Sequence, residues 1–185
     1  MVVNLHSNIR GQYMKKSLIL FALILMPLCR CFAQGPYSQY LTDGVKAPFI
    51  LISKPELTLT LVDSCGVAIV RYRCACSKYY GNKERKGDNK TPEGTFKITQ
   101  LLNSKSIPHD FHDGKGPIVG AYGPWFMRLS VPGFNDIGIH GTHLPESIGT
   151  RATEGCIRLR NEDVLDLKKR VHVGTDVIIL PDVNK

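Results

Sequence analysis

The sequence has no apolar segment long enough to cross a bilayer, for which a helix needs about 20 apolar residues. Its most apolar run extends only from Leu18 to Leu28. It also lacks the biased composition of disordered or collagen-like chains, because 43% of its residues are hydrophobic and 22% are charged. These absences predict one compact globular domain that is a monomer and has no transmembrane anchor.

Signals of nucleic-acid recognition are missing as well, since no recognition motif and no interleaving of aromatic and basic residues occurs. Acidic residues are outnumbered, with 16 Asp and Glu against 24 Lys and Arg. A basic domain concentrates near an anionic polymer such as a cell wall, but charge alone does not identify a partner. We therefore expect no nucleic-acid partner.

The N-terminal part has the order of a secretory signal. Residues 14–33 begin with Met14 and two lysines, continue with the apolar run and end at Ala33, in the sequence MKKSLILFALILMPLCRCFA. Such segments are removed on export. We expect cleavage after Ala33, a tether over residues 34–47, one domain over residues 48–182, and a location in the periplasm or cell wall.

Short segments of strand character follow one another along the domain. They are β-branched or aromatic in composition, or alternate apolar and polar residues, over residues 48–53, 56–62, 67–77, 94–99, 125–131 and 175–180. A turn at residues 63–66 closes the first hairpin, and residues 78–93 form a long exposed loop. One helix begins at Asn161 as its N-cap and ends in three basic residues. The pattern predicts a mainly β sandwich or partly open barrel.

Four cysteines remain after the expected cleavage: Cys65, Cys74, Cys76 and Cys156. Cys74 and Cys76 lie two apart on one face of a strand, where an extended backbone disfavours a bond between them. We interpret them as buried apolar residues, with a bond from either to Cys65 left open.

Residues 138–163 contain a histidine and a cysteine, His140 and Cys156, each beside a glycine. A thiolate is a strong nucleophile, and a neighbouring imidazole accepts its proton and lowers its pKa from about 8.5. Gly155 permits backbone N–H groups to approach an oxyanion. An inert buried cysteine beside a turn is the alternative interpretation.

Five sequence blocks resemble one known family. They are TPEGTF at 91–96, IHGT at 139–142, PESIG at 145–149, TEGCIRLRNED at 153–163 and VGTDVIIL at 173–180. Their order and spacing are similar to those of the L,D-transpeptidase catalytic domain (YkuD-like) family. The resemblance implies a mainly β, L,D-transpeptidase-type β-sandwich of mixed sheets, with one short helix after the cysteine.

Residue roles follow from the same resemblance. Cys156 matches the nucleophile and His140 the general base, while the residues matching oxyanion or substrate-binding positions are Gly155, Gly141, Thr153 and Arg158. Many members have Ser and often His where this chain has Thr153 and Glu154, and Glu154 bears on acceptor preference. A covered site is also implied, to which the 78–93 loop, Tyr122 and Trp125 contribute.

The implied activity is that of a peptidoglycan L,D-transpeptidase without a cofactor. Its donor is a tetrapeptide stem, and its acceptor is the amine of another stem or of an outer-membrane protein lysine. With water as acceptor, the same site is an L,D-carboxypeptidase or endopeptidase.

Two other classes of protein are compatible with single features of the sequence. A zinc site would use the pairs His109 with His112 and His140 with His143, but both pairs lie in Gly- and Pro-rich loops rather than on one helix face, so no metal is expected. A non-enzymatic wall-binding module would have no need of a thiol.

Overall fold

The computed structural model describes residues 35–42, 44–112 and 114–182. The secretory signal expected at 14–33 lies outside the described residues. Twelve strands and one α-helix form the described part, together with 3-10 turns at Ser38–Tyr40 and Pro145–Ser147. The strands are β1 Phe49–Ser53, β2 Thr58–Val62, β3 Ala68–Arg73, β4 Cys76–Ser77, β5 Gly94–Asn103, β6 Pro108–His109, β7 Ile118–Val119, β8 Trp125–Leu129, β9 Gly138–His140, β10 Arg151–Thr153, β11 Ile157–Arg158 and β12 Asp176–Leu180.

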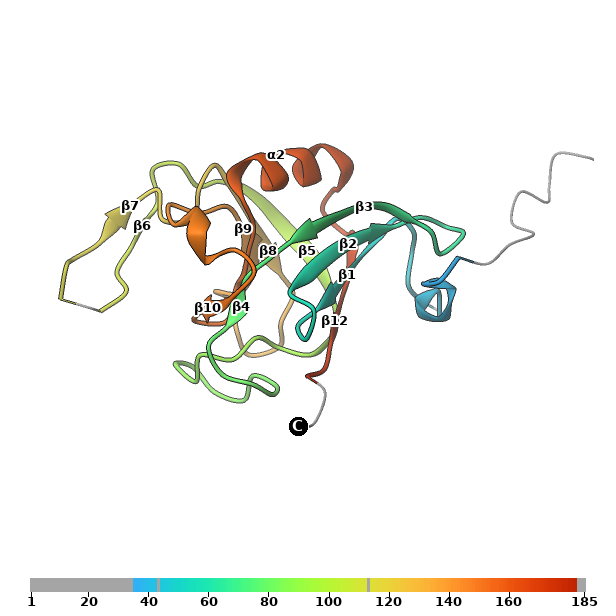
Figure 1. Cartoon of the computed structure of the whole chain (residues 1–185), viewed down its shortest axis with the longest axis horizontal. Helices are drawn as coiled ribbons and strands as arrows, with labels where there is room; N and C mark the ends of the chain where they lie inside the picture. The colour runs from blue at the N-terminus through green and yellow to red at the C-terminus, as the bar shows by residue number, and fades with distance from the viewer. Residues whose placement is uncertain (1–34, 43, 113, 183–185) are drawn as a thin grey trace, which may run out of the picture. The chain divides into compact units, whose positions relative to one another are not determined.

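Eight of these strands form one mixed sheet in the order β11-β9-β8-β5-β12-β1-β2-β3. Its β1–β12 and β9–β11 pairs are parallel and the others are antiparallel. The long strand β5 joins the two halves, because residues 94–97 pair with β12 and residues 98–103 pair with β8 across an irregularity between Ile98 and Gln100. The sheet is curled (Figure 1), and an irregularity of this kind bends the strand that carries it.

The helix α2, Asn161–Arg170, packs on β8 and β9 through Val164 and Leu167 (Figure 1). Asn161 is not its N-cap, contrary to the expectation. Arg160 occupies that position with extended backbone and makes no capping hydrogen bond through its side chain. The Asn161 side chain instead accepts a hydrogen bond from the N–H of Thr142 in a neighbouring loop. The residue that the sequence predicts as a helix cap therefore makes a tertiary contact.

The mainly β prediction is confirmed, and so are the six strand segments. Alternation in the 67–77 segment is confirmed from Arg71 to Cys74, where Tyr72 and Cys74 are buried while Arg71 and Arg73 are exposed, but it ends there because Ala75 is as fully buried as Cys74 and Cys76. The five strands that the pattern did not reveal (β6, β7, β9, β10 and β11) have only two or three residues each. Such strands are too short to display a period.

Residues 35–47, expected as a tether, contact the sheet. Tyr37, Tyr40 and Leu41 pack against Phe49 and neighbouring buried side chains. The N–H of Gly35 donates to the carbonyl of Cys65 at 2.8 Å. Apolar side chains spaced through a polar segment are sufficient to hold it against the domain.

A buried lysine organises the loop over residues 78–93. The Lys54 ammonium, which is fully buried, lies 2.5 Å from Glu93 Oε1 and 3.0 Å from Asp182 Oδ2. It also donates to the carbonyl of Gly81 at 3.0 Å, and Arg151 pairs with Asp182 as well. One ion cluster thus ties the loop to the end of β1 and to the C-terminal side of β12.

Strands β6 and β7 form a separate hairpin that projects beyond the sheet (Figure 1). Among the described residues, no helix has the length and apolar character needed to span a membrane.

Replacing Lys54 by Met should lower the free energy of unfolding by about 3–5 kcal/mol, because Glu93 loses its ionic partner and Asp182 keeps only Arg151. The Arg71–Glu56 pair, with both side chains about half exposed, provides the control. Arg71→Met should change that free energy by less than about 1 kcal/mol. Urea denaturation measures both variants, and equal losses would show that the cluster adds nothing beyond a surface pair.

Candidate active site

The parallel pairing of β9 and β11 brings the two candidate residues together. Ile157 pairs with Ile139 and Arg158 pairs with His140, while the N–H of Leu159 donates to the carbonyl of His140 at 2.8 Å. Cys156 directly precedes β11 and is therefore level with Gly138. Because alternate residues of a strand share a face, Cys156, His140 and Arg158 point to one side. All three line one cavity of about 490 Å³.

His140 is held in one orientation by its neighbours. Its ring stacks on Phe126 with centroids 5.6 Å apart, and Tyr122 meets its edge at 4.9 Å. Its Nδ1 lies 2.6 Å from the carbonyl oxygen of Gly141 and donates to it, which leaves Nε2 of the neutral ring as a proton acceptor. Burial of the ring lowers the pKa of His140 to about 3. The imidazole is therefore neutral at physiological pH.

The Cys156 thiol is half-buried and donates to the carbonyl oxygen of Asp136 at 3.3 Å. Burial raises its pKa to about 11, against the opposing effects of the Gly138 N–H and of the positive charges of Arg158 and Lys83. The pKa of Cys156 is thus raised, whereas the sequence predicted that a neighbouring imidazole would lower it. The expected lowering required a charged imidazole, and burial keeps the ring of His140 neutral.

Gly155 and Thr153, which precede Cys156 in the chain, shape the turn that carries the cysteine. Gly155 has φ +140°, and a Cβ there would meet the carbonyl oxygen of Lys90 at 2.8 Å. The buried Thr153 hydroxyl donates to the carbonyl of Cys156 at 2.7 Å and accepts the N–H of Gly155 at 3.3 Å. The turn is therefore braced from within, and glycine is required at 155.

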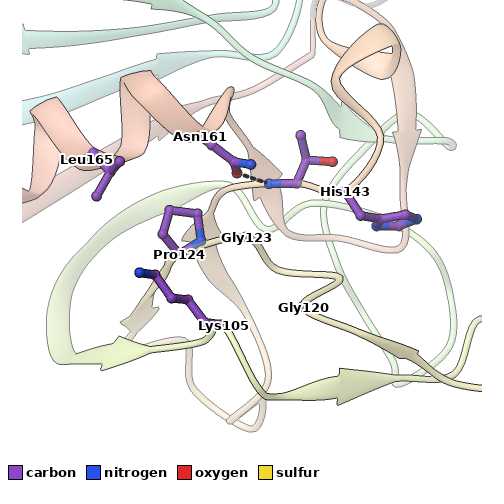
Figure 2. Close-up of a pocket in the computed structure, with 8 residues that line it drawn as sticks. Lys105, Gly120, Gly123, Pro124, His143, Asn161 and Leu165 are labelled. Carbon is purple, nitrogen blue, oxygen red and sulfur yellow. Dashed lines mark hydrogen bonds between the residues drawn. The ribbon is translucent and has the colours of Figure 1, made fainter.

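The loop after His140 rests on Asn161. The Asn161 side-chain oxygen accepts the N–H of Thr142 at 2.8 Å, next to a second cavity of about 440 Å³ (Figure 2). A Cβ at Gly141 or Gly123 would lie 2.4 or 2.2 Å from that oxygen. The N–H of Gly141 donates to the carbonyl of Trp125 at 3.3 Å, so its carbonyl is aimed at His140. No sequence pattern indicates this contact, because it joins helix and loop only in the folded chain.

Arg158 is a buried cation in the wall of the cavity. One guanidinium nitrogen donates to Ser147 Oγ at 2.9 Å, whereas its Nε has no hydrogen-bond partner in the described part of the chain. Its backbone is fixed by reciprocal hydrogen bonds with Ala75, at 2.8 and 2.9 Å.

The rim of the cavity comes from the 78–93 loop and from the β6–β7 hairpin region. Lys83, Lys86 and Asn89 contribute from the loop, and Tyr122 contributes from the end of the hairpin region. Trp125 does not line this cavity, contrary to the expectation. It packs against the core, with the Lys168 ammonium 4.5 Å from its ring centroid.

The histidines considered as metal ligands have other surroundings. His109 contacts Glu154 and Tyr122, His112 is exposed, and His143 Nδ1 lies 3.3 Å from the carbonyl of Ala121. Within the described ranges, no three or more His, Cys, Asp or Glu side chains are grouped to hold a metal ion.

The strand cysteines are buried and carry free thiols, so neither is bonded to Cys65. Their sulfur atoms are 3.9 Å apart. The contact with Cys76, followed by burial, raises the pKa of Cys74. The interpretation of Cys74 and Cys76 as buried apolar residues is confirmed.

Fold and cavity together define a class: a mainly β domain with a curled mixed sheet, in which a cysteine immediately before one strand shares a cavity with a buried neutral histidine on the adjacent parallel strand. The family model of the YkuD L,D-transpeptidase catalytic domain matches residues 47–179. The chain therefore belongs to the L,D-transpeptidase catalytic domain family.

Similar proteins agree with this assignment. YkuD of Bacillus licheniformis and YqjB of Bacillus subtilis, both named as L,D-transpeptidases, are 45% identical over 91 residues and 35% identical over 99 residues. These matches cover 49% and 52% of this chain but only 46% and 56% of the relatives, so the chain spans about half the length of the curated relatives it matches.

Solved structures share the fold. The helical cell shape determining protein Pgp2 of Campylobacter jejuni has a TM-score of 0.58 at 20% identity, covering 74% of this chain and 48% of Pgp2. The catalytic domain of the Enterococcus faecium L,D-transpeptidase has a TM-score of 0.55 at 16% identity, covering 74% of this chain and 99% of that domain.

The pKa directions predict how Cys156 reacts with iodoacetamide. Only the thiolate is alkylated, so the rate should rise about tenfold per pH unit from pH 7 to 9 without a plateau. Peptide mass spectrometry of timed samples measures the adduct, with Cys156→Ser as the control. A rate independent of pH between 6 and 8 would indicate a thiolate and imidazolium pair in the resting protein instead.

Proposed function

We propose that this chain is a peptidoglycan L,D-transpeptidase with Cys156 as nucleophile and His140 as general base. The observation that supports it most directly is the β9–β11 register, which places the two side chains on one face and in one cavity within a domain of this family. The donor is a tetrapeptide stem, and the acceptor is an amine.

In the first half-reaction, Cys156 Sγ attacks the carbonyl carbon of the third stem residue. The thiol of the resting protein is protonated and His140 has a low pKa, so the proton moves to Nε2 as the sulfur attacks rather than beforehand. The C–S bond forms and the C–N bond to D-alanine breaks. D-alanine leaves with the proton that His140 releases.

In the second half-reaction, an amine attacks the thioester, the new C–N bond forms and the C–S bond breaks. The sulfur regains a proton through His140, which restores the starting state. The buried positive charge of Arg158 in the cavity wall suits a carboxylate of the stem.

Turnover of a tetrapeptide stem tests the two roles. Cys156→Ser should abolish it, and His140→Ala should slow it about 10²-fold or more because general base assistance is lost. Mass spectrometry of the products measures both. Cys76→Ser is the matched control and should retain the chemistry.

A pentapeptide stem should not be processed in the same assay. Wild-type rates in Cys156→Ser or His140→Ala would refute the assignment. Free tripeptide as the only product would identify water as the acceptor and make the enzyme an L,D-carboxypeptidase.

We also propose export through the signal at residues 14–33, which leaves a periplasmic or cell-wall form beginning near Gln34. N-terminal sequencing of the protein from the producing cell should find neither Lys15 nor Lys16. Detection of either residue in the mature form would contradict cleavage.

A further inference from the structure

Three side chains on the rim of the cavity form a continuous chain that ends against His140. Glu154 Oε2 lies 3.2 Å from Nε2 of His109, and Nδ1 of His109 lies 2.8 Å from the Tyr122 hydroxyl. The Tyr122 ring in turn meets the edge of the His140 ring at a centroid distance of 4.9 Å. All four side chains line the same cavity.

The hydrogen bonds of this chain have one consistent direction. A carboxylate only accepts, so Nε2–H of His109 donates to Glu154, and in the neutral ring the lone pair on Nδ1 accepts from Tyr122. Burial, together with the negative charges near it, raises the pKa of Tyr122 to about 12, which keeps the hydroxyl protonated as a donor. Glu154 is therefore held in position by His109, and a neutral His109 ring leaves the carboxylate without a counter-charge.

Glu154 differs from the other two carboxylates that line the cavity. Asp110 accepts the N–H of His112 at 2.8 Å on the hairpin. Asp136 is exposed and contacts the Cys156 thiol through its backbone carbonyl, so among the described residues no hydrogen bond holds its carboxylate in place. Glu154 is only two residues from Cys156, and its side chain is 41% exposed. His109 contacts only one oxygen of the Glu154 carboxylate, Oε2. The second oxygen of the carboxylate is also a hydrogen-bond acceptor.

We propose that Glu154 is the acceptor-binding residue: its carboxylate binds the ammonium group of the incoming amine beside the Cys156 thioester, and His109 and Tyr122 position it. This inference rests on the proposed function, and it assigns a cationic amine as the preferred acceptor over water or an uncharged nucleophile.

A single carboxylate at this position is sufficient for the proton transfers of the aminolysis reaction. The bound ammonium group transfers one proton to Glu154, which passes that proton to water. The nitrogen of the resulting amine then attacks the thioester carbonyl. The C–N bond forms, the C–S bond breaks, and the second proton from the nitrogen reaches the Cys156 sulfur through His140. The products are the amide, the free thiol and one proton in solvent.

The experiment compares two nucleophiles that compete with water for the same thioester. With a tetrapeptide donor at neutral pH, Nα-acetyl-lysine amide supplies an ammonium group, whereas hydroxylamine is uncharged. Mass spectrometry measures the ratio of aminolysis product to hydrolysed tripeptide, and intact-protein mass measures the thioester on Cys156.

Glu154→Gln retains an oxygen that accepts from His109 but removes the charge. It should lower the aminolysis ratio with the lysine amide about tenfold or more, the scale of a lost hydrogen bond to a charged group. The lysine amide concentration at half-saturation should rise, whereas the hydroxylamine ratio and the rate of thioester formation should not change. Glu154→Asp should restore part of the preference. Glu84→Gln removes the same charge from an exposed position in the 78–93 loop and should behave as wild type.

Each contrary result has a distinct meaning. Normal thioester formation with an unchanged lysine amide ratio overturns the inference and leaves the proposed function intact. An equal loss with both nucleophiles, or the same loss in Glu84→Gln, also overturns it, because the effect would then be structural or a general effect of charge. Absence of a thioester in the wild-type protein refutes the proposed function and this inference with it.

Discussion

Two residue pairs between β9 and β11 determine the geometry on which the site depends. Ile157 opposite Ile139 and Arg158 opposite His140 place alternate side chains on a common face. A slip by one residue would turn Cys156 or His140 to the other side of the sheet. The register is held from both sides, because β8 pairs with β9 and Ala75 bridges to Arg158. Ile139 and Ile157 are fully buried, so the residues that fix the register also belong to the core.

Burial on that face gives the pair of Cys156 and His140 an uncharged resting state. It raises the pKa of Cys156 and lowers that of His140, so neither group carries charge near neutral pH. The contact of His140 Nδ1 with Gly141 decides which ring nitrogen remains free. The next residue, Thr142, is held in turn by the hydrogen bond from its N–H to the Asn161 side chain (Figure 2). The orientation of the imidazole thus depends on the first residue of α2.

The longer strands and the helix were predictable because each has a period or composition of its own. Strands β9, β10 and β11 were not, since two or three residues acquire their conformation from neighbouring strands. Sequence blocks identified Cys156, His140 and Arg158, which the structure brings to one cavity. They did not reveal the roles of Asn161 or Asp136, nor the position of Trp125. Those contacts join segments that are distant in sequence, and the direction of the Cys156 pKa shift depends on burial that no local pattern encodes.

The Lys54 cluster has a consequence for the order in which the chain folds. It joins a residue of the first hairpin to Asp182, 128 positions further along, and Asp182 also accepts the N–H of Gly81. Contacts of such separation form only after the entropy of closing a long loop has been overcome. The 78–93 loop therefore acquires its fixed position only when the last strand is in place. A chain that is synthesised from its N-terminus therefore completes one wall of the cavity at the end of its folding. Truncation before residue 182 removes an anchor of that wall.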